Sequence, residues 1–218
     1  MVRHNARVIV MSLILLFALS SVHGAWAGPP TDQLRDGVDR VFAILRDPAL
    51  EGDTKVTQRR SAISKVAGEI FDFGEMAKRS LGPHWTQRTP AERGEFVRLF
   101  TALIERSYIS RVDQHGSEKT VVRGETVDDD QAVVRTTLLL SNGGQMPLDY
   151  RMRNTAGRWL VYDLNVDGIS LVANYRAQFN KIIRIDSYGA LVAKLALKSN
   201  QAEFSVPGAA PSGAKAAR

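Results

Sequence analysis

The chain has 218 residues, carries 29 Lys and Arg against 23 Asp and Glu, and contains no cysteine. This composition excludes disulfide bonds and thiol catalysis, and the length suffices for one domain with a core of its own. The modest positive charge fits plain solubility, an anionic membrane surface or an acidic partner better than nucleic acid, since no exposed aromatic stacking platform is predicted.

The N-terminal residues have the order of a secretory signal. Arg3 and Arg7 precede an apolar run over residues 8–19, and the small residues that follow end in AWA at Ala27. Such an order predicts a cleavable signal peptide over residues 1–27 and an exported, periplasmic protein. An uncleaved anchor is the alternative, but crossing a bilayer takes about 20 apolar residues and this run is shorter. Cleavage leaves 27 basic and 23 acidic residues, a net charge of +4.

Amphipathic helices dominate the first half of the remaining chain. Helices are predicted over residues 32–46 and 58–70, followed by a third in the stretch FDFGEMAKRSLGPHW at residues 71–85. In that stretch the apolar and small residues recur at the spacing of one helix face. The Gly82-Pro83 pair is expected to end this helix.

The fourth helix has a clear start. Thr89, Pro90 and Glu92 form a capping box, so a helix is predicted from there to the pair His115-Gly116. One face of this helix carries Phe96, Phe100, Leu103, Ile104 and Tyr108.

After residue 116 the apolar period changes from 3.6 to 2. Strands are predicted over residues 119–127, 132–141, 145–154 and 158–166, joined by short turns such as Asn142-Gly143, which indicates an antiparallel meander. Two closing helices are expected over 170–183 and from 187 to about 201. The fold class is therefore α+β, with a four-stranded or slightly larger curved sheet packed against several helices. We place this domain at residues 28–204 and a disordered tail at 205–218.

No catalytic constellation is evident in the sequence. His84 and His115 lack metal-ligand spacing, and no nucleotide or hydrolase motif occurs, so we predict no metal, no cofactor and no catalytic residue. Asp149, Asp163 and His84 remain the candidates if the chain is an isomerase-like or hydratase-like enzyme, although both aspartates occupy strand positions where surface exposure is expected.

Arginines recur along the four predicted strands. They could form a basic stripe that contacts phosphate or an acidic partner, or they could simply keep an exposed sheet face soluble. The second interpretation is favoured. The residues are Arg123, Arg135, Arg151, Arg153 and Arg158.

Two long motifs resemble one known family. They are FDF-x-x-MA-x-x-x-LG-x-x-W at residues 71–85 and W-x-VYD-x-x-x-x-GISLV-x-NYR-x-x-F at residues 159–179. Together with the helix between them they resemble the MlaC/Ttg2D family of periplasmic phospholipid-binding proteins, also called toluene-tolerance auxiliary components. The resemblance runs from about residue 32 to 200.

The resemblance implies a sheet and surrounding helices that enclose a deep apolar pocket. It also implies a carrier that moves phospholipid between an outer-membrane lipoprotein–porin complex and an inner-membrane ABC transporter complex, which maintains outer-membrane lipid asymmetry. A hopanoid or related polycyclic lipid is the alternative cargo. We expect the pocket wall to be formed by Phe73, Met76, Leu81, Trp85, Phe96, Phe100, Leu103, Tyr108, Leu148, Tyr150, Met152, Leu160, Tyr162, Val172, Tyr175 and Phe179. A pure adaptor with a filled core is a third possibility.

Overall fold

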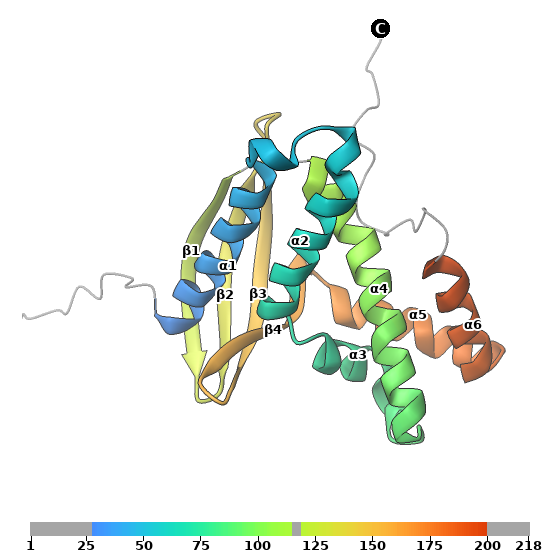
Figure 1. Ribbon diagram of the computed structural model, residues 1–218. Helices are drawn as coiled ribbons and strands as arrows, with labels where there is room; N and C mark the ends of the chain where they lie inside the picture. Colours follow the sequence, from blue (N-terminus) through green and yellow to red (C-terminus); the bar gives the residue numbers. More distant parts are fainter. Residues whose placement is uncertain (1–27, 115–118, 200–218) are drawn as a thin grey trace, which may run out of the picture.

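The computed structural model describes residues 28–114 and 119–199, which form an α+β fold (Figure 1). The predicted signal peptide, His115 and the predicted tail lie outside these residues. Helices and short 3-10 turns occur in the order α1 Pro29–Leu45, η1 Pro48–Leu50, η2 Asp53–Lys55, α2 Val56–Ile70, α3 Phe73–Leu81, η3 Gly82–Trp85, α4 Pro90–Gln114, α5 Leu171–Ile185 and α6 Tyr188–Ser199.

The sheet is an open antiparallel meander in the order β1-β2-β3-β4-β5. Its strands are β1 Lys119–Asp128, β2 Gln131–Leu139, β3 Gln145–Thr155, β4 Arg158–Val166 and β5 Ile169–Ser170. The four predicted strands and their turns are confirmed. The two-residue β5 was missed because it is too short to show an alternating pattern.

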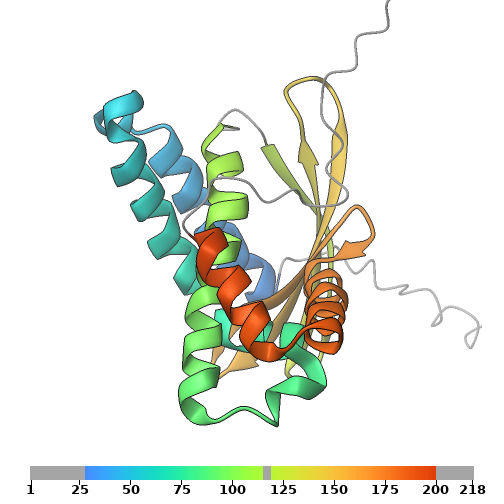
Figure 2. The same cartoon turned by 90° about the vertical axis from the view of Figure 1, so that its right-hand side faces the viewer.

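The helices divide into two groups around the sheet (Figures 1 and 2). α1 and α2 pack together over one sheet face, where Gly37 of α1 allows a close approach: a Cβ there would lie 2.6 Å from Ile70 Cδ1 of α2. Helices α3, α4, α5 and α6 pack mainly on one another beyond the β4 edge. The chain joins the two groups at Phe71 and Asp72, where the Asp72 amide donates to the Val161 carbonyl of β4 at 2.9 Å.

Helix starts follow the sequence signals in part. The Thr89–Glu92 capping box forms as predicted, with the Thr89 amide donating to Glu92 Oε2 at 2.8 Å and the Glu92 amide donating to Thr89 Oγ1 at 3.3 Å. α1 begins three residues earlier than predicted, at Pro29. Its first turn is capped from the sheet, because Glu125 Oε2 accepts both the Thr31 amide at 2.8 Å and the Thr31 hydroxyl at 2.6 Å.

The expected end of the third helix at Gly82-Pro83 is confirmed, because α3 ends at Leu81 with Gly82 as its C-cap. Gly82 takes the positive φ of 59° that a C-terminal glycine favours, but the chain continues as the 3-10 turn η3. Proline is tolerated there because the first residues of a helical turn need no hydrogen bond from their amides. The turn carries His84 and Trp85 toward α5 and α4.

Candidate functional site

The structure has two apolar cores, which we call the helical core and the sheet core. The helical core is built by α3, α4, α5 and α6 and contains an aromatic cluster of Phe96, Phe100, Tyr175 and Phe179. Phe100 meets Tyr175 edge to face at 5.6 Å between ring centroids, and Phe96 meets Phe179 in the same way at 5.7 Å. Edge-to-face pairs at these separations are favourable aromatic contacts, so these rings hold one another in place.

Most of the predicted pocket residues lie in or against the helical core. Met76 and Phe96 are fully buried, whereas Phe73, Trp85 and Tyr108 are half-buried at its border. The members of the predicted set in this region are Phe73, Met76, Leu81, Trp85, Phe96, Phe100, Leu103, Tyr108, Val172, Tyr175 and Phe179.

The sheet core lies between α1, α2 and the inner face of the sheet. It contains three residues of the predicted set, Leu148, Tyr150 and Met152, together with Val134 and Trp159. Burial raises the pKa of Tyr150 to about 12, since the apolar surroundings disfavour the phenolate. These three residues therefore belong to a different core from the other eleven members listed above.

Leu160 and Tyr162 do not lie on the inner sheet face as expected. Leu160 is in register with Arg153, which alternates with the inward Met152. An irregularity in β4 near Arg151 and Met152 shifts the pairing, and the Tyr162 hydroxyl lies 3.3 Å from Gln131 Oε1. Trp159 and Val161 belong to the sheet core, so Leu160 between them points to the other face, and the expected phase of this strand was wrong. The bulge at Tyr162 then shifts the alternation, which returns Leu164 and Val166 to the inner face.

Burial in the sheet core falls off toward the β2–β3 hairpin. Val134 and Met152 are fully buried, while Leu138 and its register partner Met146 are only half-buried. Half-buried Val41 and Ile44 of α1 pack against the same core. We call Val41, Ile44, Leu138, Met146 and Val166 the apolar rim.

The apolar rim lies where several elements end together. Figures 1 and 2 place the C-terminal ends of α1 and α4, the N-terminal end of α2 and the β2–β3 hairpin at one end of the molecule. The buried Ser107 hydroxyl, near the C-terminal end of α4, has no hydrogen-bond partner in the described part of the chain. This end therefore combines incompletely covered apolar side chains with an unsatisfied hydroxyl group.

Two of the three candidate catalytic groups, His84 and Asp163, have structural partners. His84 Nε2 lies 3.0 Å from Asn180 Oδ1. Asp163 is buried, contrary to the expected exposure, because it accepts the Ser170 hydroxyl at 2.6 Å and the Val172 amide at 3.1 Å at the start of α5. A carboxylate at a helix N-terminus stabilises the exposed amides there. No group of three His, Asp or Glu suited to hold a metal ion occurs within residues 28–114 and 119–199.

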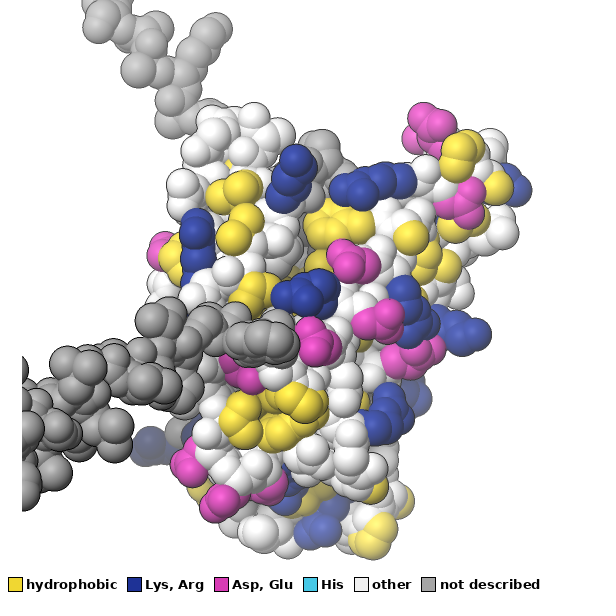
Figure 3. All heavy atoms as spheres, turned by 90° about the vertical axis from the view of Figure 1, so that its left-hand side faces the viewer, with side chains coloured by type: hydrophobic (Ala, Val, Ile, Leu, Met, Phe, Trp, Pro, Cys, Tyr) yellow, Lys and Arg dark blue, Asp and Glu magenta, His cyan; other side chains and the backbone are white. Residues whose placement is uncertain are grey.

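The strand arginines do not form one free stripe. Arg153 pairs with Asp72 at 3.6 Å and with Glu75 at 3.7 Å, and Arg158 donates to the Glu69 carbonyl at 3.1 Å. Arg123 and Arg135 donate to threonine hydroxyls of neighbouring strands. Viewed from the side of β1 and α1, Lys and Arg lie among Asp and Glu (Figure 3). These contacts favour the structural interpretation of the arginines.

Comparison with known proteins decides the family. The family model described as "MlaC protein" matches residues 35–197. This chain belongs to the MlaC family. The resemblance noted in the two long motifs is thereby confirmed over nearly the whole described chain.

Similar proteins point the same way. The chain is 24% identical over 126 residues to the intermembrane phospholipid transport system binding protein MlaC of Haemophilus influenzae, covering 56% of this chain and 59% of that protein. It is 23% identical over 169 residues to the toluene tolerance protein ttg2D of Pseudomonas putida, covering 77% and 79%.

A solved structure shares the fold. It is a phospholipid-binding protein from Ralstonia solanacearum in complex with a phospholipid, 28% identical, with a TM-score of 0.71 over 80% of this chain and 99% of that one. Within the described residues, none of the helices of this chain has both the length and the apolarity needed to cross a membrane.

Sequence reasoning missed the apolar rim. Val41 and Ile44 are absent from the predicted set because it takes no residue from the first helix. Leu138 and Met146 flank the Asn142-Gly143 turn, and that position next to a hairpin was the available signal.

Proposed function

We propose that this chain is a periplasmic phospholipid carrier. The observation that carries the proposal is the match in fold, with a TM-score of 0.71, to a protein solved with a phospholipid bound. Membership of the MlaC family supports the same conclusion. In this role the chain would be exported by its predicted signal peptide and would bind its cargo without chemical change.

We place the acyl chains at the apolar rim, between α1, α2 and the inner sheet face. Half-buried Leu138, Met146 and Ile44 support this location. Covering partly exposed apolar side chains with a hydrocarbon tail removes apolar surface from water, which is favourable. Residues of the sheet core, Leu148 and Tyr150 among them, would form the deeper wall. The aromatic cluster of the helical core would then act as support for the site.

The cost of exposing acyl chains to water explains why a lipid would need such a carrier. A two-chain phospholipid has on the order of 30 methylenes, and exposing each to water costs about 0.8 kcal/mol, a gross cost of roughly 24 kcal/mol for crossing an aqueous compartment uncovered. We propose that the chain accepts lipid from one membrane complex and releases it to another, an outer-membrane lipoprotein–porin complex and an inner-membrane ABC transporter complex, and so maintains outer-membrane lipid asymmetry. Its affinity must stay comparable to the hold of donor and acceptor, because a carrier that binds far more tightly would retain its lipid.

The test uses two neighbouring residues on opposite sheet faces. Leu138→Trp fills the apolar rim, whereas Leu139→Trp makes the same enlargement at the next half-buried residue, whose side chain points to the other face. We expect native mass spectrometry of protein purified from the periplasm to show bound lipid in the wild type and in Leu139→Trp, and little in a folded Leu138→Trp variant. Wild-type protein that is reproducibly free of lipid would refute the carrier function. Equal lipid loss in both variants would refute only the site.

Extraction and mass spectrometry of the bound lipid distinguishes the cargoes. Recovery of a hopanoid or related polycyclic lipid would replace the phospholipid proposal. An enzymatic function would require an effect of His84→Ala, Asp149→Asn or Asp163→Asn beyond stability, and the contacts of His84 and Asp163 with Asn180 and the start of α5 give both residues a structural role already.

A further inference from the structure

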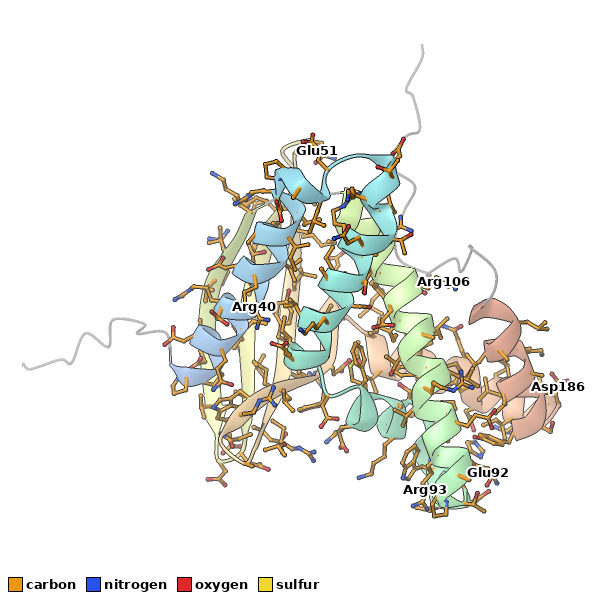
Figure 4. All side chains as sticks on the ribbon, viewed as in Figure 1. Arg40, Glu51, Glu92, Arg93, Arg106 and Asp186 are labelled. Carbon is orange, nitrogen blue, oxygen red and sulfur yellow. The ribbon has the colours of Figure 1, made fainter. Side chains whose placement is uncertain are left out.

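The positive charge of the molecule is concentrated at its C-terminal helices. Residues 28–170 carry 20 Lys and Arg against 21 Asp and Glu, so they are close to neutral. Residues 171–199, which form α5 and α6, carry five Lys and Arg and one Asp. That single acid, Asp186, lies at the junction of the two helices (Figure 4) and pairs with Lys194 at 2.7 Å.

The exposed face of α5 bears uncompensated cations. Lys181 and Arg184 are exposed, α5 itself contains no acidic residue, and neither side chain makes an ion pair in the described part of the chain. They line a surface depression of about 320 Å³ together with Ala177, Asn180 and Ile185. The small Ala177 side chain leaves room there for a group that protrudes from a facing surface.

The same two helices carry the two most exposed large hydrophobic residues of the described part of the chain. Ile185 is 70% exposed and Leu197 is 62% exposed, against 49% for Ile169 and 48% for Val127, the other large hydrophobic residues in the exposed class. Ile185 directly follows Arg184 and lies at the rim of the depression. Basic residues near a membrane surface are attracted to anionic lipid headgroups, and an exposed apolar residue beside them can reach the boundary of the acyl chains.

We infer that α5 docks the protein on an anionic phospholipid bilayer. The headgroup phosphates would contact Lys181 and Arg184, one of them in the depression, while Ile185 reaches the acyl boundary. A bilayer presents phosphate beside hydrocarbon, which matches both chemistries of this face. This docking surface is separate from the apolar rim and does not depend on the identity of the cargo.

The experiment measures flotation of the purified mature protein with vesicles. One set is phosphatidylcholine alone, and the other contains about 30% phosphatidylglycerol. We expect binding to the anionic vesicles only, weakening as salt rises because surface charges are screened. The double variant Lys181→Glu/Arg184→Glu should reduce binding about 30-fold or more, since each basic residue near such a surface contributes roughly fivefold. Ile185→Ser should reduce it several-fold.

Matched controls test the location. Lys55→Glu/Lys65→Glu changes the same number of exposed charges on or next to α2, and Val127→Ser removes an exposed apolar residue from the sheet. Both should bind within about twofold of the wild type. The proposal would be overturned if the control and the α5 variant lost vesicle binding equally. It would also be overturned if the wild type bound phosphatidylcholine vesicles as well as anionic ones. No flotation of the wild type with anionic vesicles at low salt would also overturn it and would leave an acidic protein as the partner for this face.

Discussion

The aromatic cluster of the helical core and the apolar rim of the sheet core differ in how completely they are covered. In the aromatic cluster the rings of Phe96, Phe100, Tyr175 and Phe179 contact one another at 5.5–6.1 Å and are at most 3% exposed. In the sheet core, full burial at Val134 and Met152 gives way to the half-buried apolar rim near the β2–β3 hairpin. The packed aromatic cluster therefore holds the helices together, whereas the half-buried apolar rim marks the place that we propose for lipid.

Truncation in the helical core should have the largest effect on stability. Phe100→Ala removes a fully buried ring with three aromatic neighbours, so we expect a loss of about 3–5 kcal/mol in the free energy of unfolding. Leu138→Ala at the apolar rim should lose less than half as much. Urea titrations of both variants measure the difference. A larger loss at Leu138 would contradict the contrast between the two cores.

Alkaline unfolding should report burial of the sheet core. A tyrosine whose pKa rises from 10.0 in the unfolded chain to about 12 in the folded one favours folding at lower pH, and this contribution disappears as the pH rises from 10 to 12. Tyr150→Phe cannot ionise, so the variant should lose about 2 kcal/mol less than the wild type over this interval. Denaturant titrations at both pH values give the result. If the wild type and Tyr150→Phe lose the same free energy of unfolding between pH 10 and 12, the Tyr150 hydroxyl reaches solvent.

Packing between α1 and α2 should depend on one glycine. Gly37→Ala places a Cβ 2.6 Å from Ile70 Cδ1 and Cγ1, so we expect a loss of about 1–2 kcal/mol. Gly68→Ala in α2 meets nothing within 4 Å and should gain up to about 1 kcal/mol from helix propensity. Thermal unfolding of this pair compares the two sites. We expect the unfolding temperature to fall in Gly37→Ala and to rise in Gly68→Ala. Equal changes in the two variants would contradict the close approach of the helices.

The smallest predicted effect concerns the cap of α1. Glu125→Gln keeps an acceptor for Thr31 but removes its charge, so we expect a loss of about 1 kcal/mol. Glu69→Gln, which alters an exposed pair with Arg40, should change stability very little. Hydrogen exchange of the first turn of α1 offers a local measurement. Unchanged protection in Glu125→Gln would contradict a capping role from the sheet.

The elements were predictable because their signals are local. The capping box at Thr89–Glu92, the alternation of Leu148, Tyr150 and Met152, and the short hairpin turns each lie within a few residues. The predicted site was harder to obtain. Phe96 and Leu148 both point inward, but into different cores, and periodicity reports that a residue is buried without reporting what it meets.

The sequence by itself determined the α+β order, the antiparallel meander, the absence of thiol chemistry and the two motifs of the MlaC family. Only the tertiary structure decided that Leu160 and Tyr162 face away from the sheet core, that Asp163 and Glu125 serve helix starts, and that the basic charge collects on α5 and α6. The physical reason is distance along the chain. Periodicity and caps depend on neighbours a few residues away, whereas burial, bulges and shared surfaces depend on segments that meet only after folding.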